Sequence, residues 1–141
     1  MITHVLDTSA LLAHYLREPG AEDVQVILAR GPEETGVSLI TLVELRGRLT
    51  ELVADLTEVE RAFKLYTETL TTTLPFTRET ADAAMELRSA THPRLPMVDS
   101  LIAASAKQHG ATLVHRDGHM AGIPATLVSQ KDLPPKPSSA S

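Results

Sequence analysis

The chain has 141 residues, a length that suits one domain with its own hydrophobic core. It contains no cysteine, which excludes disulfides and thiolate metal sites, and its net charge of -5 argues against broad nucleic-acid binding driven by charge alone. The sequence shows neither a signal peptide nor an apolar run of the roughly 20 residues that cross a bilayer, so we expect a cytoplasmic protein without a membrane anchor.

The first half of the chain alternates short apolar segments with segments of helical spacing. Ser9 is the predicted N-cap of the first helix, and Pro19 with Gly20 is expected to stop it. In chain order, the predicted elements are a strand over 3–6, helices over 10–19 and 20–30, a strand over 35–38, and helices over 38–52 and 58–70. The leucines of the third helix fall on one stripe that we expect to be buried: Leu42, Leu45, Leu49 and Leu52.

The second half continues the alternation of strands and helices. The predicted elements are an extended segment over 71–76, helices over 78–90 and 97–109, and strands over 111–117 and 125–129. Thr77 caps the first of these helices, while Pro96 suits the first turn of the second and Gly110 its end. Residues 130–141 are rich in Pro and Ser, so we predict a domain over 1–129 and a disordered tail over 130–141.

Strands that alternate with helices indicate an α/β fold, in which helices cover both faces of a short parallel sheet. Ligands of such sheets bind beyond the carboxyl ends of the strands. Asp7 follows the first predicted strand, and Asp117 ends a later one. Both acids are therefore expected at the same edge of the sheet, where a site is expected.

Four acidic residues stand in otherwise apolar sequence: Asp7, Glu44, Asp99 and Asp117. Each one alone has an ordinary structural explanation as a turn residue, a helix cap or a solvated helix residue. Together they come from four distant segments, and carboxylates that meet repel one another unless a proton or a cation intervenes. Oxygen ligands suit hard cations, so a site of this kind favours Mg²⁺ or Mn²⁺ over zinc.

The segments VLDTSALL, SLITLVEL, PMVDSLIAASA and LVHRDGHM resemble, in order and approximate spacing, the motifs of the PIN-domain ribonucleases. The compact layout is similar to the VapC-type toxins of bacterial toxin–antitoxin pairs, and the resemblance runs from Ile2 to about Ser129. It implies a three-layer α/β/α PIN-like fold with a short central parallel sheet. It also implies RNA cleavage dependent on Mg²⁺ or Mn²⁺, a homodimer, and silencing by a cognate antitoxin protein.

By matching position, the resemblance assigns the catalytic and metal-binding roles to Asp7, Glu44, Asp99 and Asp117. Thr8 and Ser9 match the polar pair that supports the site, and Ser9 is expected both to cap its helix and to point at the pocket. The chain departs from the family near the fourth acid, because His115 stands where Thr or Ser is usual and Met120 where an aromatic residue is common.

RNA is an anion, so basic residues are expected at the rim of an acidic pocket. The candidates beside the acids in sequence are Arg46, Arg94, Arg116 and His115. With two Phe, two Tyr and no Trp, the chain has no aromatic platform for stacking bases, which favours recognition of a folded RNA by its shape and backbone.

Two other functions fit parts of the same pattern. One is a PIN-like module that binds RNA or a partner without catalysis, although four intact acids argue against it. The other is a phosphoacceptor domain of the receiver type, which is also an α/β fold with acids at strand ends. Receiver domains usually pair adjacent acids early in the chain and use a lysine from a late strand; here Asp7 stands alone, and ATLVHRD and ATLVS contain no lysine.

Overall fold

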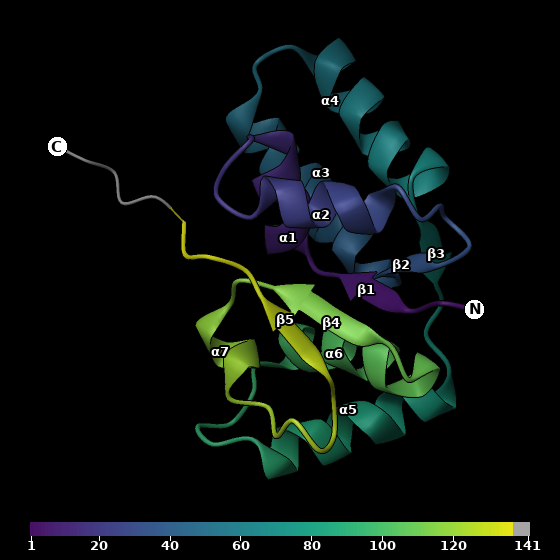
Figure 1. Cartoon of the computed structure of the whole chain (residues 1–141), viewed down its shortest axis with the longest axis vertical. Helices are drawn as coiled ribbons and strands as arrows, with labels where there is room; N and C mark the ends of the chain where they lie inside the picture. The colour runs from purple at the N-terminus through teal and green to yellow at the C-terminus, as the bar shows by residue number, and fades with distance from the viewer. Residues whose placement is uncertain (137–141) are drawn as a thin grey trace, which may run out of the picture.

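The computed structural model describes residues 1–136 and shows one parallel sheet between two layers of helices (Figure 1). Within these residues the sheet has five strands in the order β3-β2-β1-β4-β5. They are β1 (His4–Leu6), β2 (Thr35–Ser38), β3 (Thr72–Leu74), β4 (Thr112–His115) and β5 (Gln130–Asp132). This order also excludes the receiver-type alternative, because receiver sheets run in the order 2-1-3-4-5.

The helices divide between the two faces of the sheet: α1 to α4 cover one face, and α5 to α7 cover the other (Figure 1). Their bounds are α1 (Thr8–Tyr15), α2 (Ala21–Leu28), α3 (Leu39–Leu52), α4 (Leu56–Lys64) with a π-helical continuation η1 (Leu65–Thr69), α5 (Arg78–Ala90), α6 (Met97–His109) and α7 (Gly118–Ala121). No helix in the described part of the chain is both long and apolar enough to span a bilayer.

Two hydrophobic clusters hold the layers together, one on each face of the sheet. Alternate residues of a strand point to opposite faces, so Leu6 enters the cluster beneath α1 to α4, whereas its neighbour Val5 enters the cluster with α5 and α6. Val114 and Leu113 of β4 divide in the same way. The predicted three-layer α/β/α arrangement is therefore confirmed.

The first helix begins and ends earlier than its sequence suggested. Its N-cap is Asp7, whose carboxylate accepts the Ala10 N–H at 2.9 Å, so the prediction that Ser9 caps the helix is wrong. An aspartate directly after the strand reaches the free N–H groups first, which leaves Ser9 inside the first turn. The helix ends at Tyr15 rather than near Pro19, because Arg17 adopts a left-handed φ of 55°.

The end of the domain also differs from its prediction. The segment 125–129 is not a strand, because Leu127 N–H and Val128 N–H both donate to the Pro124 carbonyl. This turn places Val128 in the hydrophobic cluster beneath α5 and α6. The last strand is instead β5, which pairs with β4, and the following Leu133 is buried against α1 to α4. The sequence therefore predicted the start of the disordered tail too early, because Gln130–Asp132 form β5. Residues 137–141 of the predicted tail lie outside the described part of the chain.

The helix that carries Asp99 lies where the sequence placed it. α6 spans Met97–His109, and Gly110 ends it with a left-handed φ of 60° that glycine adopts without strain. Pro96 is the N-cap rather than a first-turn residue, a shift of one position. Thr77 caps α5 through a capping box with Thr80, as predicted.

Candidate active site

The four acids predicted from the sequence meet in one cleft of about 360 Å³. Each comes from a different part of the fold: Asp7 from the end of β1, Glu44 from α3, Asp99 from the first turn of α6, and Asp117 from the N-cap of α7. The parallel sheet explains this convergence, because β1 and β4 are neighbours and end at the same edge. The cleft also contains Thr8 and Ser9, the polar pair that follows the first acid.

Asp7 is the most deeply placed of these acids, with 4% of its surface exposed. Its Oδ1 atom accepts hydrogen bonds from the Ser9 hydroxyl at 2.7 Å and from the Ala10 N–H at 2.9 Å. Burial, with a smaller effect of the Asp117 and Glu44 carboxylates, nevertheless raises the pKa of Asp7 to about 7. The two hydrogen bonds therefore fix the orientation of the Asp7 carboxylate but compensate its charge only in part.

The polar pair after Asp7 links three parts of the cleft. The Thr8 hydroxyl donates to Glu44 Oε1 at 2.7 Å, which ties α3 to the start of α1. The Ser9 hydroxyl donates to Asp7 and accepts the Arg116 N–H at 3.0 Å, which ties α1 to the segment after β4. Both residues therefore hold acidic side chains in place, and Ser9 does so without capping the helix.

Asp99 faces the same negative field from α6. Burial and, after it, the charges of Asp117 and Glu44 raise the pKa of Asp99 to about 6, although His119 and His115 act in the opposite direction. Its side chain is 16% exposed. Two acids with raised pKa values in one cleft are typical of a functional site.

Asp117 is held by a buried network that begins at β5. The Asp117 backbone N–H donates to His115 Nδ1 at 3.0 Å, so that nitrogen carries no proton, and the opposite nitrogen Nε2 donates to Gln130 Oε1 at 2.8 Å. Gln130 in turn donates to the Ile123 carbonyl at 2.9 Å. His115 has no exposed surface, so its side chain offers no contact to RNA, contrary to the prediction. It supports the fourth acid, Asp117, instead.

This network predicts a specific loss of stability. Replacing Gln130 with Leu leaves the buried His115 N–H without an acceptor, so we expect the unfolding free energy to fall by about 1–3 kcal/mol. The control is Lys131→Leu at the next, exposed position of β5, where we expect a change within about 0.5 kcal/mol. Urea denaturation measures both; equal losses in the two variants would contradict the proposed support.

The structure adds a residue to the cluster that the sequence reading passed over as a metal ligand. His119 lies two residues after the Asp117 cap, in the first turn of α7, and one ring nitrogen and one oxygen each from Asp99 and Asp117 all lie within 4.8 Å of one another. The signal was present in the spacing Asp117-Gly-His119, because a helix N-cap folds the next residues back over its own side chain.

The basic residues near the acids divide into two groups. Arg116 lines the cleft and forms an ion pair with Glu18, and Arg48 and Lys136 also line it. Arg46 points elsewhere, with its guanidinium 2.8 Å from Glu60 and over the Phe63 ring. Arg94 is exposed in the loop before α6 and is not among the residues that line the cleft. Lys136 follows β5, in the segment predicted to be disordered.

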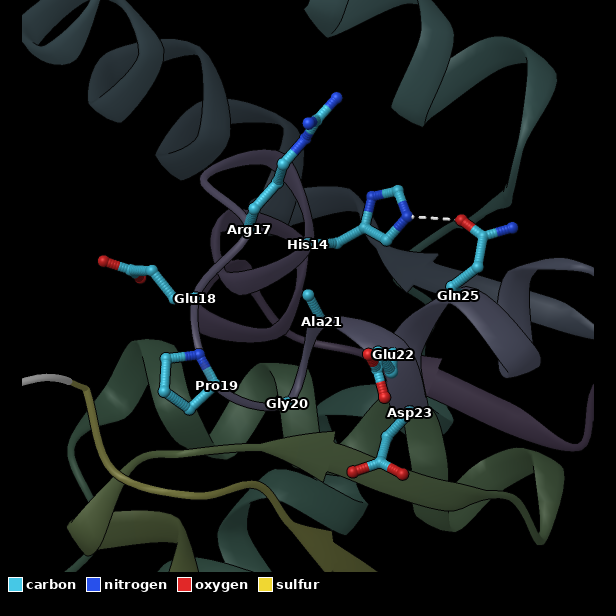
Figure 2. A pocket seen from close by; sticks show the side chains of 9 residues that line it. All are labelled: His14, Arg17, Glu18, Pro19, Gly20, Ala21, Glu22, Asp23 and Gln25. Carbon is cyan, nitrogen blue, oxygen red and sulfur yellow. Dashed lines mark hydrogen bonds between the residues drawn. The ribbon is translucent and has the colours of Figure 1, made fainter.

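A larger hollow of about 810 Å³ lies beside the loop between α1 and α2, and none of the four acids lines it. In Figure 2 the His14 ring faces Gln25, and their Nε2 and Oε1 atoms are 2.7 Å apart. The charged side chains of Arg17, Glu18 and Asp23 point away from one another (Figure 2). These groups do not converge on a common point, so the hollow lacks the converging acidic side chains that line the cleft.

The donors in the cleft fit a divalent cation. Carboxylate oxygens are the ligands that Mg²⁺ and Mn²⁺ prefer, and the chain has no thiolate that would favour a softer metal. Burial and, to a smaller extent, the neighbouring carboxylates raise the pKa values of Asp7 and Asp99, and a bound cation would offset both effects. The cations that line the cleft are partly engaged already, since Arg116 pairs with Glu18 and Arg48 with Glu51.

Comparison with solved structures finds the same fold in several proteins. VapBC2 from Rickettsia felis, solved with a promoter DNA fragment, aligns with a TM-score of 0.74 and 17% identity over 94% of this chain and 100% of that chain. FitAcB from Neisseria gonorrhoeae aligns with a TM-score of 0.69 and 27% identity over 92% and 97%. VapBC-5 from Mycobacterium tuberculosis, of the VapBC family of toxin–antitoxin systems, aligns with a TM-score of 0.63 and 22% identity over 94% and 98%.

Sequence comparison gives the family directly. No curated protein matches the chain. The family model described as PIN domain, however, matches residues 4–125, from the first residue of β1 to beyond α7. This range includes all four acids of the cleft, together with Thr8, Ser9 and His119. The chain therefore belongs to the PIN domain family.

Proposed function

We propose that this chain is a metal-dependent endoribonuclease, the toxin of a VapBC-type toxin–antitoxin pair, which hydrolyses RNA phosphodiester bonds in the acidic cleft. One observation carries the proposal: four acids from four separate elements line a single cleft at the carboxyl edge of the sheet. Membership of the PIN domain family and the likeness to toxin–antitoxin structures support it.

The acids have different surroundings and therefore different proposed roles. Asp7 and Asp99 are assigned as the direct ligands of Mg²⁺ or Mn²⁺, because burial makes their charge the most costly to leave unpaired. When bound, such a cation polarises a phosphoryl oxygen and lowers the pKa of a coordinated water. Glu44 is more exposed than Asp7 and is assigned to orient the attacking water and to accept its proton. Asp117, which lies close to Asp99 and His119, is assigned as a further ligand of the cation.

The supporting residues keep these acids in position during the reaction. Thr8 holds Glu44 through a hydrogen bond of 2.7 Å, and Ser9 holds Asp7 through another of 2.7 Å. Because each hydrogen bond occupies one carboxylate oxygen, the other oxygen of each acid has no hydrogen bond among the described residues and is free to face the cation. Carboxylates that are already held in position need little reorganisation when the substrate binds.

The test of this function is the sequencing of RNA ends after expression of the wild type and of Asp99→Asn. We expect new 5′ ends at defined positions for the wild type and none above background for the variant. Asp82→Asn on the exposed face of α5 serves as the matched control and is expected to cleave like the wild type. RNA that binds to the purified protein but stays uncut with Mg²⁺ and with Mn²⁺ would favour the alternative, a PIN-like module without catalysis.

Two protein partners follow from the same proposal. We propose a homodimer, and a cognate antitoxin that silences the enzyme by placing a basic side chain in the acidic cleft. A short reading frame beside this one is expected to encode that antitoxin. Its co-expression is expected to restore growth and to copurify with the chain, whereas growth arrest that persists in its presence would reject the pairing.

The segment after β5 is proposed to contribute to RNA binding. Lys136 lines the cleft, so Lys136→Gln in the Asp99→Asn background is expected to weaken RNA binding at all sequences alike. The slope of log affinity against log salt is expected to fall by about 0.7–1, which corresponds to one phosphate contact. Lys64→Gln on α4 is the control, and an unchanged slope in Lys136→Gln would place this lysine outside the RNA path.

A further inference from the structure

The His119 imidazole faces two acids of the cleft at ion-pair distances that are longer than a charge-assisted hydrogen bond. Nδ1 lies 3.3 Å from Asp117 Oδ1 and 3.9 Å from Asp99 Oδ2. A charge-assisted N–H···O hydrogen bond between the ring and either carboxylate would bring the atoms to about 2.7–2.9 Å. The ring nitrogen therefore lies near both acids but is not at charge-assisted hydrogen-bond distance from either.

The same distances suit ligands that share an ion. Metal–oxygen and metal–nitrogen bonds of about 2.0–2.2 Å hold two ligands roughly 3–4.4 Å apart, from adjacent to opposite positions. The spacings of 3.3 Å and 3.9 Å both fall in this interval. The ligand atoms of Asp99, Asp117 and His119 are moreover all within 4.8 Å of one another, so a single cation can reach all three.

The backbone fixes the ring in this place without burying it. The His119 N–H donates to Asp117 Oδ1 at 2.7 Å, so the residue is folded back over the acid that it faces. The next residue, Met120, is buried in the hydrophobic cluster beneath α5 and α6 and anchors the short helix α7. The His119 side chain is 62% exposed, so its removal takes little from the core.

We propose that His119 supplies an imidazole ligand to the metal site, which makes this chain select Mn²⁺ over Mg²⁺. The inference rests on the proposed function and deepens it. A neutral imidazole adds a ligand without adding charge to carboxylates that already repel one another. Imidazole nitrogen suits transition metals far better than it suits Mg²⁺, whose ligands in proteins are oxygens.

The direct readout is the Mn²⁺ spectrum of the purified protein. Electron spin echo modulation detects a nitrogen bound to Mn²⁺, and we expect this signal in the wild type and its loss in His119→Ala. Continuous-wave measurements of free Mn²⁺ give the affinity, which we expect to fall at least about tenfold in His119→Ala. Competition by Mg²⁺ gives its own affinity, which we expect to change less than about twofold, because Mg²⁺ takes oxygen ligands.

The control is His109→Ala, which removes an exposed histidine at the far end of α6 and is expected to leave the spectrum and both affinities unchanged. Mn²⁺ that binds to the wild type without nitrogen modulation, and equally well to His119→Ala, would overturn this inference while leaving the acid site intact. Wild-type protein that takes up no more Mn²⁺ than Asp99→Asn would overturn the proposed function as well.

Discussion

Asp7→Asn is expected to abolish RNA cleavage and at the same time to stabilise the metal-free protein. The carboxylate is a proposed ligand, so its loss should lower the cleavage rate by at least about 100-fold, as when an electrostatic contact to the transition state is removed. The Asn Oδ1 atom can still accept the hydrogen bonds from Ser9 and Ala10, so the helix cap remains. Removing a buried charge that repels Asp117 and Glu44 should raise the unfolding free energy at pH 8.

Cleavage of a short RNA with Mn²⁺ measures the first effect, and urea denaturation without divalent cations measures the second. Asp82→Asn is the matched control, since it makes the same chemical change on an exposed helix face and should alter neither quantity. Loss of activity together with loss of stability would mean that Asp7 serves the fold alone. Retained activity would remove it from the proposed mechanism.

The stability of the metal-free protein is expected to fall as the pH rises from about 4 to 7. The pKa of Asp7 is raised from 3.8 to about 7, so between these values the unfolded chain has lost a proton that the folded chain keeps. The folded state then binds more protons than the unfolded state, and the unfolding free energy decreases with pH. For Asp7 the complete change is on the order of 4 kcal/mol, and the raised pKa of Asp99 acts in the same direction.

Urea denaturation at a series of pH values, in the presence of a chelator, measures this slope. The wild type is expected to lose stability across the range, whereas Asp7→Asn should lose clearly less because its side chain does not titrate. Saturating Mn²⁺ should flatten the wild-type profile near pH 7 by stabilising the ionised form. A wild-type profile that rises through this range, or that matches Asp7→Asn, would contradict the environment assigned to Asp7.

Much of the fold and the four acids could be predicted because local chemistry determined them. β2 spans the predicted residues 35–38, and Leu45 and Leu49 of the predicted stripe are buried, although Leu52 at the helix end is 43% exposed. The acids stood out because a charge in apolar sequence needs a partner, and parallel strands bring their carboxyl ends to one edge.

The features that the sequence did not reveal depend on contacts between distant segments. Residues 125–129 looked like a strand because apolar and β-branched residues follow one another, but the strand formed at Gln130–Asp132, which has a polar composition and pairs with β4. His115 could be read as an RNA contact because nothing in its neighbours shows that Gln130 accepts a hydrogen bond from it. Lys136 reaches the cleft only because β5 directs the chain there.

The proposed function requires that a divalent cation binds among these four acids. A crystal of the protein soaked in Mn²⁺ and measured near the manganese absorption edge tests it most directly. We predict one strong anomalous peak in the cleft, between the carboxylates of Asp7 and Asp99 and next to Asp117, and its absence in Asp99→Asn. A wild-type crystal with no anomalous peak in the cleft at saturating Mn²⁺, or with peaks only elsewhere on the surface, would contradict it.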